Sequence, residues 1–542
     1  ASNNVAVGTS ALTANSSGTD NVAVGDSAGD AVTTGSDNTL IGDNSGGALT
    51  TGGNNVAIGS GALLVATTAA DNTAVGTLAL TANSSGTDNT AVGYAAGDAV
   101  TTGSDNTFVG DNAGGATTTA SNNVAVGSSS LLVNTTGADN VAVGYLALDA
   151  NTTGASNTAV GSGALGANTD ANNNTAIGTD ALDANTTGHS QTAVGVNALG
   201  ANTTANHNVA VGNNSLLVNT TGAQNTAVGS TALDANTTAS DNTAVGYAAL
   251  SANTTGTYNV AVGSTALDAN TTANNNTALG RNTLSANTTG SENTAVGSIA
   301  LEANTTGNYN TSVGYQSGAA NVAGTENTFV GFIAGRYTGG ADHPDYNVGV
   351  GSRALYANTT GEKNVAVGAY ALAANTTAGN NTAIGYNSLG ANTTGTNNIA
   401  IGYAALDANT TTNRNIAIGT DALGVNDGGA ENVAIGYNTL DNNTTGNRNV
   451  SLGDASMDAN TTGADNTAVG QQALTANTTA NHNTAIGKLA LGANTTANNN
   501  TAVGSSALGA NTTGANNVAV GYGALDANTT ADGNVAIGKD AL

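Results

Sequence analysis

The sequence is one short unit repeated along its whole length. The motif Asn-(Thr/Val)-Ala-(Val/Ile)-Gly recurs with a period of 17 from Gly8 to Gly331, and again with the same period from Gly351 to Gly538. The one interval between these two series is longer by three positions, so the 542 residues hold 32 units and one short insertion. A repeat this strict indicates a stacked array in which each unit contacts its neighbours, rather than separate globular domains.

Each unit has the composition of strands and turns. Numbered from its leading Asn, the consensus is N-(T/V)-A-(V/I)-G-x-x-A-L-x-A-N-T-T-G-x-x, as in residues 140–156. Gly, Asn and Thr are poor helix formers, and the apolar residues form no stripe with a helical period. We predict two short strands per unit, at positions 2–4 and 8–11, joined by tight turns. Stacked in parallel, the units form an all-β solenoid of 32 coils, roughly 150 Å long at about 4.8 Å per strand.

The insertion divides this solenoid into two blocks. Residues 1–346 are interpreted as coils 1–20 and residues 347–542 as coils 21–32 of the same continuous solenoid. The longer coil at the end of the first block contains the segment 332–346, which we expect to form a loop.

Variant units indicate which positions share the interior. Leu at position 9 is replaced by Gly in three pairs of adjacent units. The pairs are Gly29 with Gly46, Gly97 with Gly114, and Gly318 with Gly335. In the second unit of each pair the Ala at position 3 is enlarged, to Leu40, Phe108 or Phe329. This exchange of volume predicts that positions 3 and 9 face one close-packed space.

Positions 2 and 4 of the strand are also mostly apolar, and they point to its opposite face. A strand that is apolar on both faces is normally buried on both. We therefore expect identical chains to associate side by side. The alternative is a flattened single solenoid with position 2 partly exposed, which the frequent Thr at that position permits.

Charge and hydropathy exclude two classes of partner. The net charge is −27, from 35 acidic and 8 basic residues, and this field disfavours nucleic-acid binding. No run approaches the roughly 20 apolar residues of a membrane helix, so we expect a chain that is not membrane-embedded. Stacked acids such as Asp20 and Asp37 lie one coil apart, where Ca²⁺ is a possible bridge. Solvated surface charge is the favoured interpretation, and no metal site or other cofactor is predicted.

Polar positions repeat as well. Asn at positions 1 and 12, with Thr at positions 13 and 14, predicts ladders of side chains that bond the turns of successive coils. Asn-Thr-Thr is also an N-glycosylation sequon, which gives a second interpretation for the following residues: Asn151, Asn185, Asn202 and Asn219.

No catalytic constellation recurs. The four His residues lie in different units, and no Ser/His/Asp or His/Glu spacing repeats, so we predict that the chain is not an enzyme. The irregular segment 332–346 is the place where a rigid scaffold would carry recognition. Its candidate binding residues are Arg336, Tyr337, Asp342, His343 and Tyr346. The alternative is a bulge between duplicated blocks. Tyr also follows the motif Gly in several units, where it either stacks on sugars or fills a groove between coils.

The pentapeptides Asn4–Gly8 and Asn55–Gly59 resemble the head repeats of YadA-type trimeric autotransporter adhesins, and similar repeats occur in some phage and virus tail fibres. The resemblance implies a left-handed parallel β-roll, a homotrimer around one axis, and an adhesive or receptor-reaching role. The head unit of that family is typically shorter than the unit of this chain. No heptad stalk, basic neck or alternating barrel strands are seen, so its self-export function is not carried over.

We therefore expect an extracellular structural fibre or adhesin, at a cell or virion surface. Its stiff, repetitive filament would attach to a host-surface receptor, a glycan or an abiotic surface through many weak contacts. One alternative is a phage or viral tail-fibre shaft. An alternative of another class is an ice-binding solenoid that presents a column of Thr hydroxyls.

Overall fold

A computed structural model describes residues 1–339 and 344–542 and divides the chain into two compact units, Ala1–Thr272 and Ala273–Leu542. The described residues form strands and turns and no helix, which confirms the predicted all-β solenoid. Each coil contributes one short strand at positions 2–4. The predicted block boundary at 346/347 lies inside the second unit.

The strands of the first unit share the sequence (Val/Thr)-(Ala/Leu/Phe)-(Val/Ile). They are β1 (Val5–Val7), β2 (Val22–Val24), β3 (Thr39–Ile41), β4 (Val56–Ile58), β5 (Thr73–Val75), β6 (Thr90–Val92), β7 (Thr107–Val109), β8 (Val124–Val126), β9 (Val141–Val143), β10 (Thr158–Val160), β11 (Thr175–Ile177), β12 (Thr192–Val194), β13 (Val209–Val211), β14 (Thr226–Val228), β15 (Thr243–Val245) and β16 (Val260–Val262).

The strands of the second unit follow a similar pattern. They are β17 (Thr277–Leu279), β18 (Thr294–Val296), β19 (Thr311–Val313), β20 (Thr328–Val330), β21 (Val348–Val350), β22 (Val365–Val367), β23 (Thr382–Ile384), β24 (Ile399–Ile401), β25 (Ile416–Ile418), β26 (Val433–Ile435), β27 (Val450–Leu452), β28 (Thr467–Val469), β29 (Thr484–Ile486), β30 (Thr501–Val503), β31 (Val518–Val520) and β32 (Val535–Ile537).

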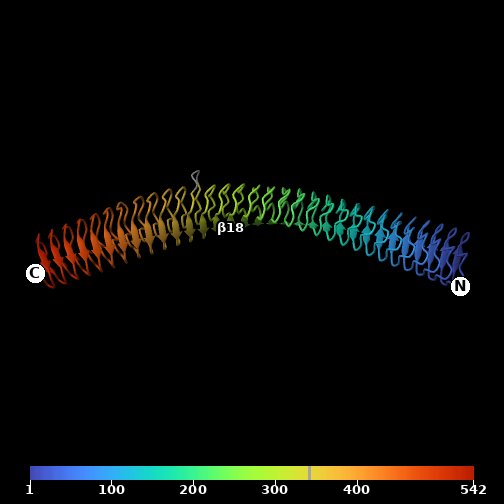
Figure 1. The fold of residues 1–542 in the computed structure, drawn as a ribbon, viewed down its shortest axis with the longest axis horizontal. Helices are drawn as coiled ribbons and strands as arrows, with labels where there is room; N and C mark the ends of the chain where they lie inside the picture. Colours follow the sequence, from blue (N-terminus) through green and yellow to red (C-terminus); the bar gives the residue numbers. More distant parts are fainter. Residues whose placement is uncertain (340–343) are drawn as a thin grey trace. The chain divides into compact units, whose positions relative to one another are not determined.

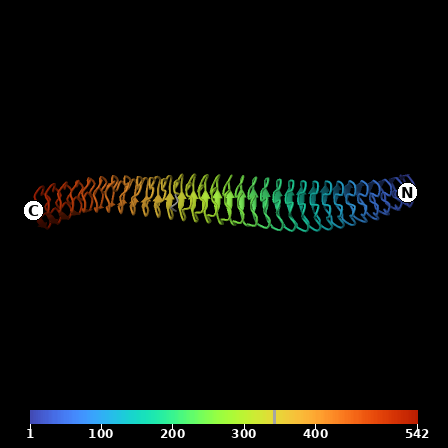
Figure 2. The same cartoon turned by 90° about the horizontal axis from the view of Figure 1, so that it is seen from above.

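Within each unit successive strands pair in parallel, with the same coil position opposite itself. Ala142 of β9, for example, pairs with Ala159 of β10. The Val141 N–H donates to the Asn157 carbonyl of the next coil at 2.8 Å, and the Gly144 N–H donates to the Val126 carbonyl of the preceding coil at 2.8 Å. Figures 1 and 2 show the resulting stack, in which each strand lies beside the strands of neighbouring coils within a unit.

The predicted second strand at positions 8–11 is wrong. Leu146 and Leu148, at positions 7 and 9, have φ values of 55° and 53°, in the left-handed region. The adjacent side chains of Ala147 and Leu148 are both fully buried. A strand cannot bury two consecutive side chains on one side, because its side chains alternate. This segment is therefore a turn, although its backbone still bonds between coils, as from the Leu148 N–H to the Ala164 carbonyl at 2.9 Å.

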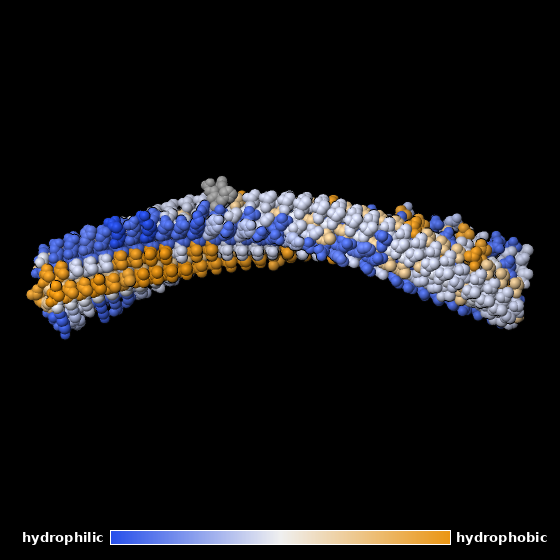
Figure 3. Space-filling model, in the orientation of Figure 1, coloured by the Kyte–Doolittle hydropathy of each residue, from blue (hydrophilic) through white to orange (hydrophobic). Residues whose placement is uncertain are grey.

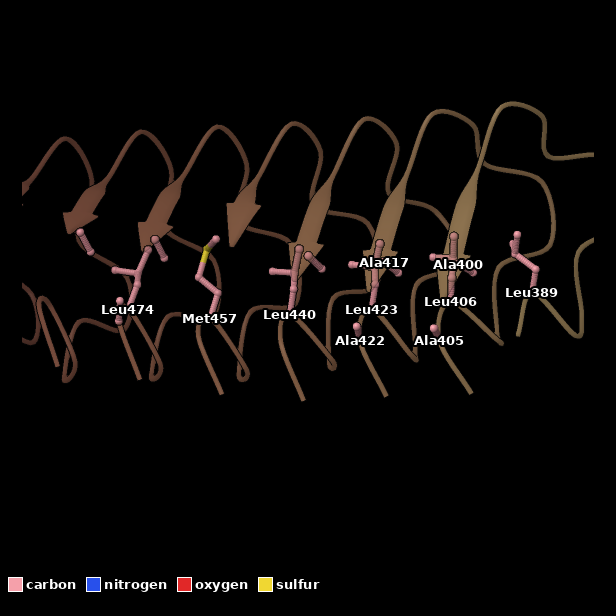
Figure 4. Packing of buried hydrophobic residues seen from close by; sticks show 14 of the residues in the cluster. Leu389, Ala400, Ala405, Leu406, Ala417, Ala422, Leu423, Leu440, Met457 and Leu474 are labelled. Atoms are coloured by element: carbon pink, nitrogen blue, oxygen red, sulfur yellow. The ribbon is translucent and has the colours of Figure 1, made fainter. Parts of the chain in front are cut away.

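The core of each unit is a column of Leu flanked by Ala. Position 9 supplies the large side chain, and positions 3 and 8 supply the Ala methyl groups, all fully buried in a typical coil. Figure 4 shows this arrangement in the second unit for Leu389, Leu406, Leu423, Leu440, Met457 and Leu474. The prediction that positions 3 and 9 share one space is thus confirmed.

The volume exchange between these positions is also confirmed. A Cβ built on Gly97 would lie 2.7 Å from Cδ2 of Phe108, and one built on Gly114 would lie 2.4 Å from its Cε1. The ring of Phe108 on β7 therefore occupies the space of Leu side chains in its own coil and in the preceding coil. The Leu40 side chain on β3 likewise occupies the space of a Leu in the preceding coil, because a Cβ built on Gly29 would lie 2.5 Å from Cδ1 of Leu40.

Two buried amide ladders hold the turns, as predicted. At position 1, Nδ2 of Asn157 donates to Oδ1 of Asn140 at 3.2 Å and to the Ala171 carbonyl at 2.9 Å. At position 12, Nδ2 of Asn151 donates to Oδ1 of Asn134 and to the Gly154 carbonyl, both at 2.9 Å. Each amide thus closes its own turn and bonds the preceding coil, which satisfies polar groups that would otherwise be buried unpaired.

Candidate functional site

The outward face of each strand points away from the core and carries Val, Ile or Leu at position 4 and Val, Ile or Thr at position 2. Position 3 is buried in nearly every strand, whereas positions 2 and 4 are half-buried or exposed. Ile177 in the first unit and Ile486 in the second are 41% and 40% exposed. In the second unit, β24, β25 and β26 carry Ile or Val at both outward positions. Figure 3 shows the hydrophobic stripe that these strands form along the second unit.

A second exposed feature is a chain of aromatic and arginine side chains in the second unit, which we name the aromatic path. It consists of Arg336, Tyr337, Arg353, Tyr356, Tyr370, Tyr386 and Tyr403, which belong to consecutive coils.

The members of the aromatic path contact one another in order. The Arg336 guanidinium carbon lies 5.2 Å from the ring centroid of Tyr337, whose centroid is 5.0 Å from that of Tyr356 in an edge-to-face arrangement. Arg353 lies between Tyr356 and Tyr370, with its guanidinium carbon 5.9 Å and 5.4 Å from their centroids. Both arrangements are favourable, because the positive guanidinium or ring edge meets the negative face of a ring.

The path continues through three Tyr residues. Tyr386 meets Tyr370 edge to face at 5.8 Å and stacks on Tyr403 at 5.5 Å, with 11° between the ring planes. Beside the path, Tyr315 and Phe332 stack at 5.9 Å. Several of these rings are open to solvent, with Tyr337 44% and Tyr403 57% exposed, whereas Tyr356 and Tyr370 are half-buried.

The predicted binding residues are only partly brought together. Arg336 and Tyr337 lie in the aromatic path, whereas Tyr346 lies in the position-17 column, where its N–H donates to the Thr325 carbonyl at 3.2 Å. Asp342 and His343 lie outside the described residues.

The insertion leaves the position-1 amide ladder intact. Across it, Nδ2 of Asn347 donates to Oδ1 of Asn327 at 3.2 Å.

Sequence reasoning missed Tyr356 and Tyr370 as members of a site. The sequence does contain a sign of these contacts, which becomes visible when each coil is numbered from its own leading Asn. Arg353 and Tyr370 then both stand at position 7, and Tyr386 and Tyr403 both stand at position 6. Equal positions in successive coils lie about 4.8 Å apart, which is stacking distance for aromatic rings.

The four sequon residues lie in the position-12 ladder. All of them are fully buried: Asn151, Asn185, Asn202 and Asn219. In Asn185, the Nδ2 atom that would carry a sugar donates to Oδ1 of Asn168 at 3.2 Å and to the Gly188 carbonyl at 2.9 Å. This geometry argues against glycosylation of the folded coil, because a glycan would replace one of the two N–H donors and could not fit in the interior.

The two Thr columns differ in their surroundings. At position 13, Oγ1 of Thr152 donates to the Thr169 carbonyl of the next coil at 2.9 Å. At position 14, Thr153 is exposed. Of these two columns, the one at position 14 is thus the more open to solvent, and a flat ice-binding plane would need neighbouring columns of equal exposure.

Acidic side chains line shallow hollows between coils. One hollow of about 440 Å³ is bordered by Asp149, Asp180 and Asp183, and it exists because Gly163 and Gly166 leave a coil without side chains there. Partial burial raises the pKa of Asp149. The pKa of Asp183 is raised by burial first and then by the charges of Asp180 and Asp149. No group of three His, Cys, Asp or Glu within the described residues is arranged to hold a metal ion.

The column at position 17 differs between the units. In the first unit it carries exposed acids such as Asp71, Asp88 and Asp105. In the second it contains ion pairs, since Arg448 bonds both carboxylate oxygens of Asp465 at 2.7 and 2.8 Å. The hydrogen bond from Arg448 lowers the pKa of Asp465.

No protein-family model matches the chain, and no curated protein is significantly similar to it. Within residues 1–339 and 344–542 there is also no helix of the length and hydropathy that a bilayer crossing requires.

Proposed function

We propose that this protein is an extracellular structural fibre or adhesin, a stiff repetitive rod that mediates attachment to a cell, a receptor or another surface. In this proposal three identical chains pack side by side through their strand faces, as a left-handed β-roll. The repetition supports such a role, because identical coils present the same weak contact many times and multivalency converts weak contacts into firm attachment.

The observation that carries the proposal is the apolar strand face. Positions 2 and 4 keep Val, Ile, Leu or Thr in almost every coil, yet a single chain leaves them half-buried or exposed. The row at position 4 is apolar without interruption in each unit, and an exposed apolar row of this kind marks an association surface in soluble proteins. Two further copies of the same chain would cover it with side chains of the same spacing, because their strands repeat at the same interval.

The mass of the particle in solution tests the association. Sedimentation equilibrium should give about three times the chain mass of 51.7 kDa. A particle near 51.7 kDa at micromolar concentration would exclude the trimer.

A variant separates the strand face from the coil itself. Ile399→Thr with Ile416→Thr places at position 2 the residue that β23 already carries there, so each coil should fold while the trimer weakens.

An adhesion assay tests the attachment role. Beads coated with the intact chain should adhere to cells or inert surfaces more than albumin-coated beads. Equal adhesion of the two would count against the attachment role.

A further inference from the structure

Apart from Tyr403, the members of the aromatic path belong to coil segments that contain no acidic residue. Positions 6–11 of five consecutive coils are residues 315–320, 332–337, 352–357, 369–374 and 386–391. These segments contain Arg336 and Arg353 and no Asp or Glu, in a chain that has 35 acidic residues. The same positions carry an acid in the coils on either side, Glu302 before the segments and Asp407 after them. Asp407 lies in the coil of Tyr403, at the end of the path, and accepts a hydrogen bond from Asn387 at 3.2 Å. These segments thus form a locally cationic strip on an anionic protein, with an acid at each end.

The two Arg side chains keep their charge available. Neither Arg336 nor Arg353 forms an ion pair among the described residues, whereas Arg414 and Arg448 in later coils do. Their guanidinium groups lie against Tyr rings, which fixes the side chains without neutralising them. A guanidinium held in this way can still donate two parallel hydrogen bonds to a carboxylate or sulfate.

We infer that the aromatic path binds an acidic oligosaccharide, in which neutral sugar rings alternate with sugars that carry a carboxylate or sulfate. The C–H face of a pyranose ring is apolar and packs on an exposed aromatic ring, and the Tyr hydroxyls supply hydrogen bonds at the edges. The path crosses several coils, roughly 20–25 Å at about 4.8 Å per coil, so its ligand is a chain of sugars and not a single one.

Charge density separates this ligand from a nucleic acid. Single-stranded nucleic acids also stack on aromatic rings, but they carry one phosphate per nucleotide. Two Arg residues cannot offset that density within a protein of net charge −27. A glycan with charge on every second sugar meets the two Arg residues and leaves neutral rings for the Tyr side chains.

The inference deepens the proposed attachment role by naming a ligand class, and its test is independent of the mass measurement. Calorimetry with the intact chain would compare three probes: a hyaluronan octasaccharide, a chitin hexasaccharide and a thymidine oligonucleotide. Hyaluronan is expected to bind most tightly. No binding of hyaluronan, equal binding of chitin, or tighter binding of the oligonucleotide would overturn the inference.

Variants connect the binding to named residues. Arg353→Gln should weaken hyaluronan binding about fivefold or more, because it removes a charge-assisted contact. Tyr386→Ala with Tyr403→Ala should weaken it about tenfold, whereas the Phe substitutions at both positions should retain most of the binding. Tyr94→Ala, an equally exposed Tyr at position 6 of a first-unit coil, is the matched control and should have no effect. If the path variants bind as well as the intact chain, the path is not the site.

Discussion

At the scale of single residues, two features of the fold require glycine at position 5, directly after each strand. Gly144, at position 5, has a φ of 138°, and a Cβ on it would lie 2.4 Å from the carbonyl oxygen of Gly161 in the next coil. Only Gly adopts this backbone conformation readily, and the adjacent coil leaves no room for a side chain. Position 15 differs in its backbone: a Cβ on Gly154 would also lie 2.4 Å from a carbonyl oxygen of the next coil, but Gly154 has no positive φ, and Ala171 and Ala205 stand at this position in other coils.

Gly144→Ala is therefore predicted to destabilise its coil by at least about 1–3 kcal/mol, from the backbone conformation alone. Gly154→Ala, at position 15 of the same coil, is the matched control, because its Cβ would meet the next coil at the same distance without a positive φ. It should destabilise the coil less, since other coils accommodate Ala there. Hydrogen exchange of the β9 and β10 amides measures the local effect, which a global melting curve of so many coils would dilute. Equal exchange rates in the two variants would show that the position-5 turn is not constrained as described.

At the scale of the coil, stability depends on how neighbouring elements share volume. A typical coil places one Leu beside the small Ala of each strand, whereas the coil of β7 places one Phe beside two Gly. Both solutions fill the same interior, because a close-packed core conserves total volume more strictly than the identity of a side chain.

Phe108→Ala should destabilise the first unit by about 3–5 kcal/mol, the usual cost of a cavity from a deleted Phe. Gly114→Leu alone should also destabilise it, since its Cβ would overlap the Phe108 ring. Phe108→Ala combined with Gly97→Leu and Gly114→Leu restores the common coil and should recover most of the loss. Urea unfolding of the single and combined variants measures this coupling. If the losses in the free energy of unfolding from the separate substitutions simply add up in the combined variant, these residues do not share one space.

At the scale of the whole molecule, electrostatics links stability to pH. Burial is the first cause of a raised pKa for a set of Asp side chains that all stand at position 10: Asp98, Asp149, Asp183, Asp234, Asp268, Asp407, Asp441 and Asp458. An Asp in the unfolded chain has a pKa of about 3.9. At pH values between the unfolded and the raised folded pKa, the folded chain binds more protons, so the free energy of unfolding rises as the pH falls.

We predict that the urea midpoint increases as the pH is lowered from neutral towards the pKa of an unfolded Asp. Relief of repulsion in a chain of net charge −27 acts in the same direction, so a charge-matched control is needed. The substitutions Asp407→Asn, Asp441→Asn and Asp458→Asn should flatten the pH dependence. Asp71→Asn, Asp88→Asn and Asp105→Asn remove the same charge from exposed positions and should flatten it less. The same slope in both variants would assign the effect to net charge alone.

Much of the fold and a little of the site were predictable from the sequence. The exact spacing predicted the stacked coils, and the Gly and Phe variants predicted which positions share the core. The aromatic path was not predicted as a site, because Tyr356, Tyr370 and Tyr386 stand at three different coil positions. Their contacts depend on where the chain places positions 6, 7 and 10 relative to one another across adjacent coils.

The sequence by itself determined the coil length, the parallel register and the composition of the core, because a strict repeat stacks like on like. Only the tertiary structure decided that each coil has one strand and that the segment after it turns through left-handed residues. The reason is that the side chains of Ala147 and Leu148 must both point into the core. Secondary-structure propensities of single residues do not reveal this requirement. Packing in three dimensions also decided that the Asn-Thr-Thr asparagines face the interior, where their amides bond turn to turn.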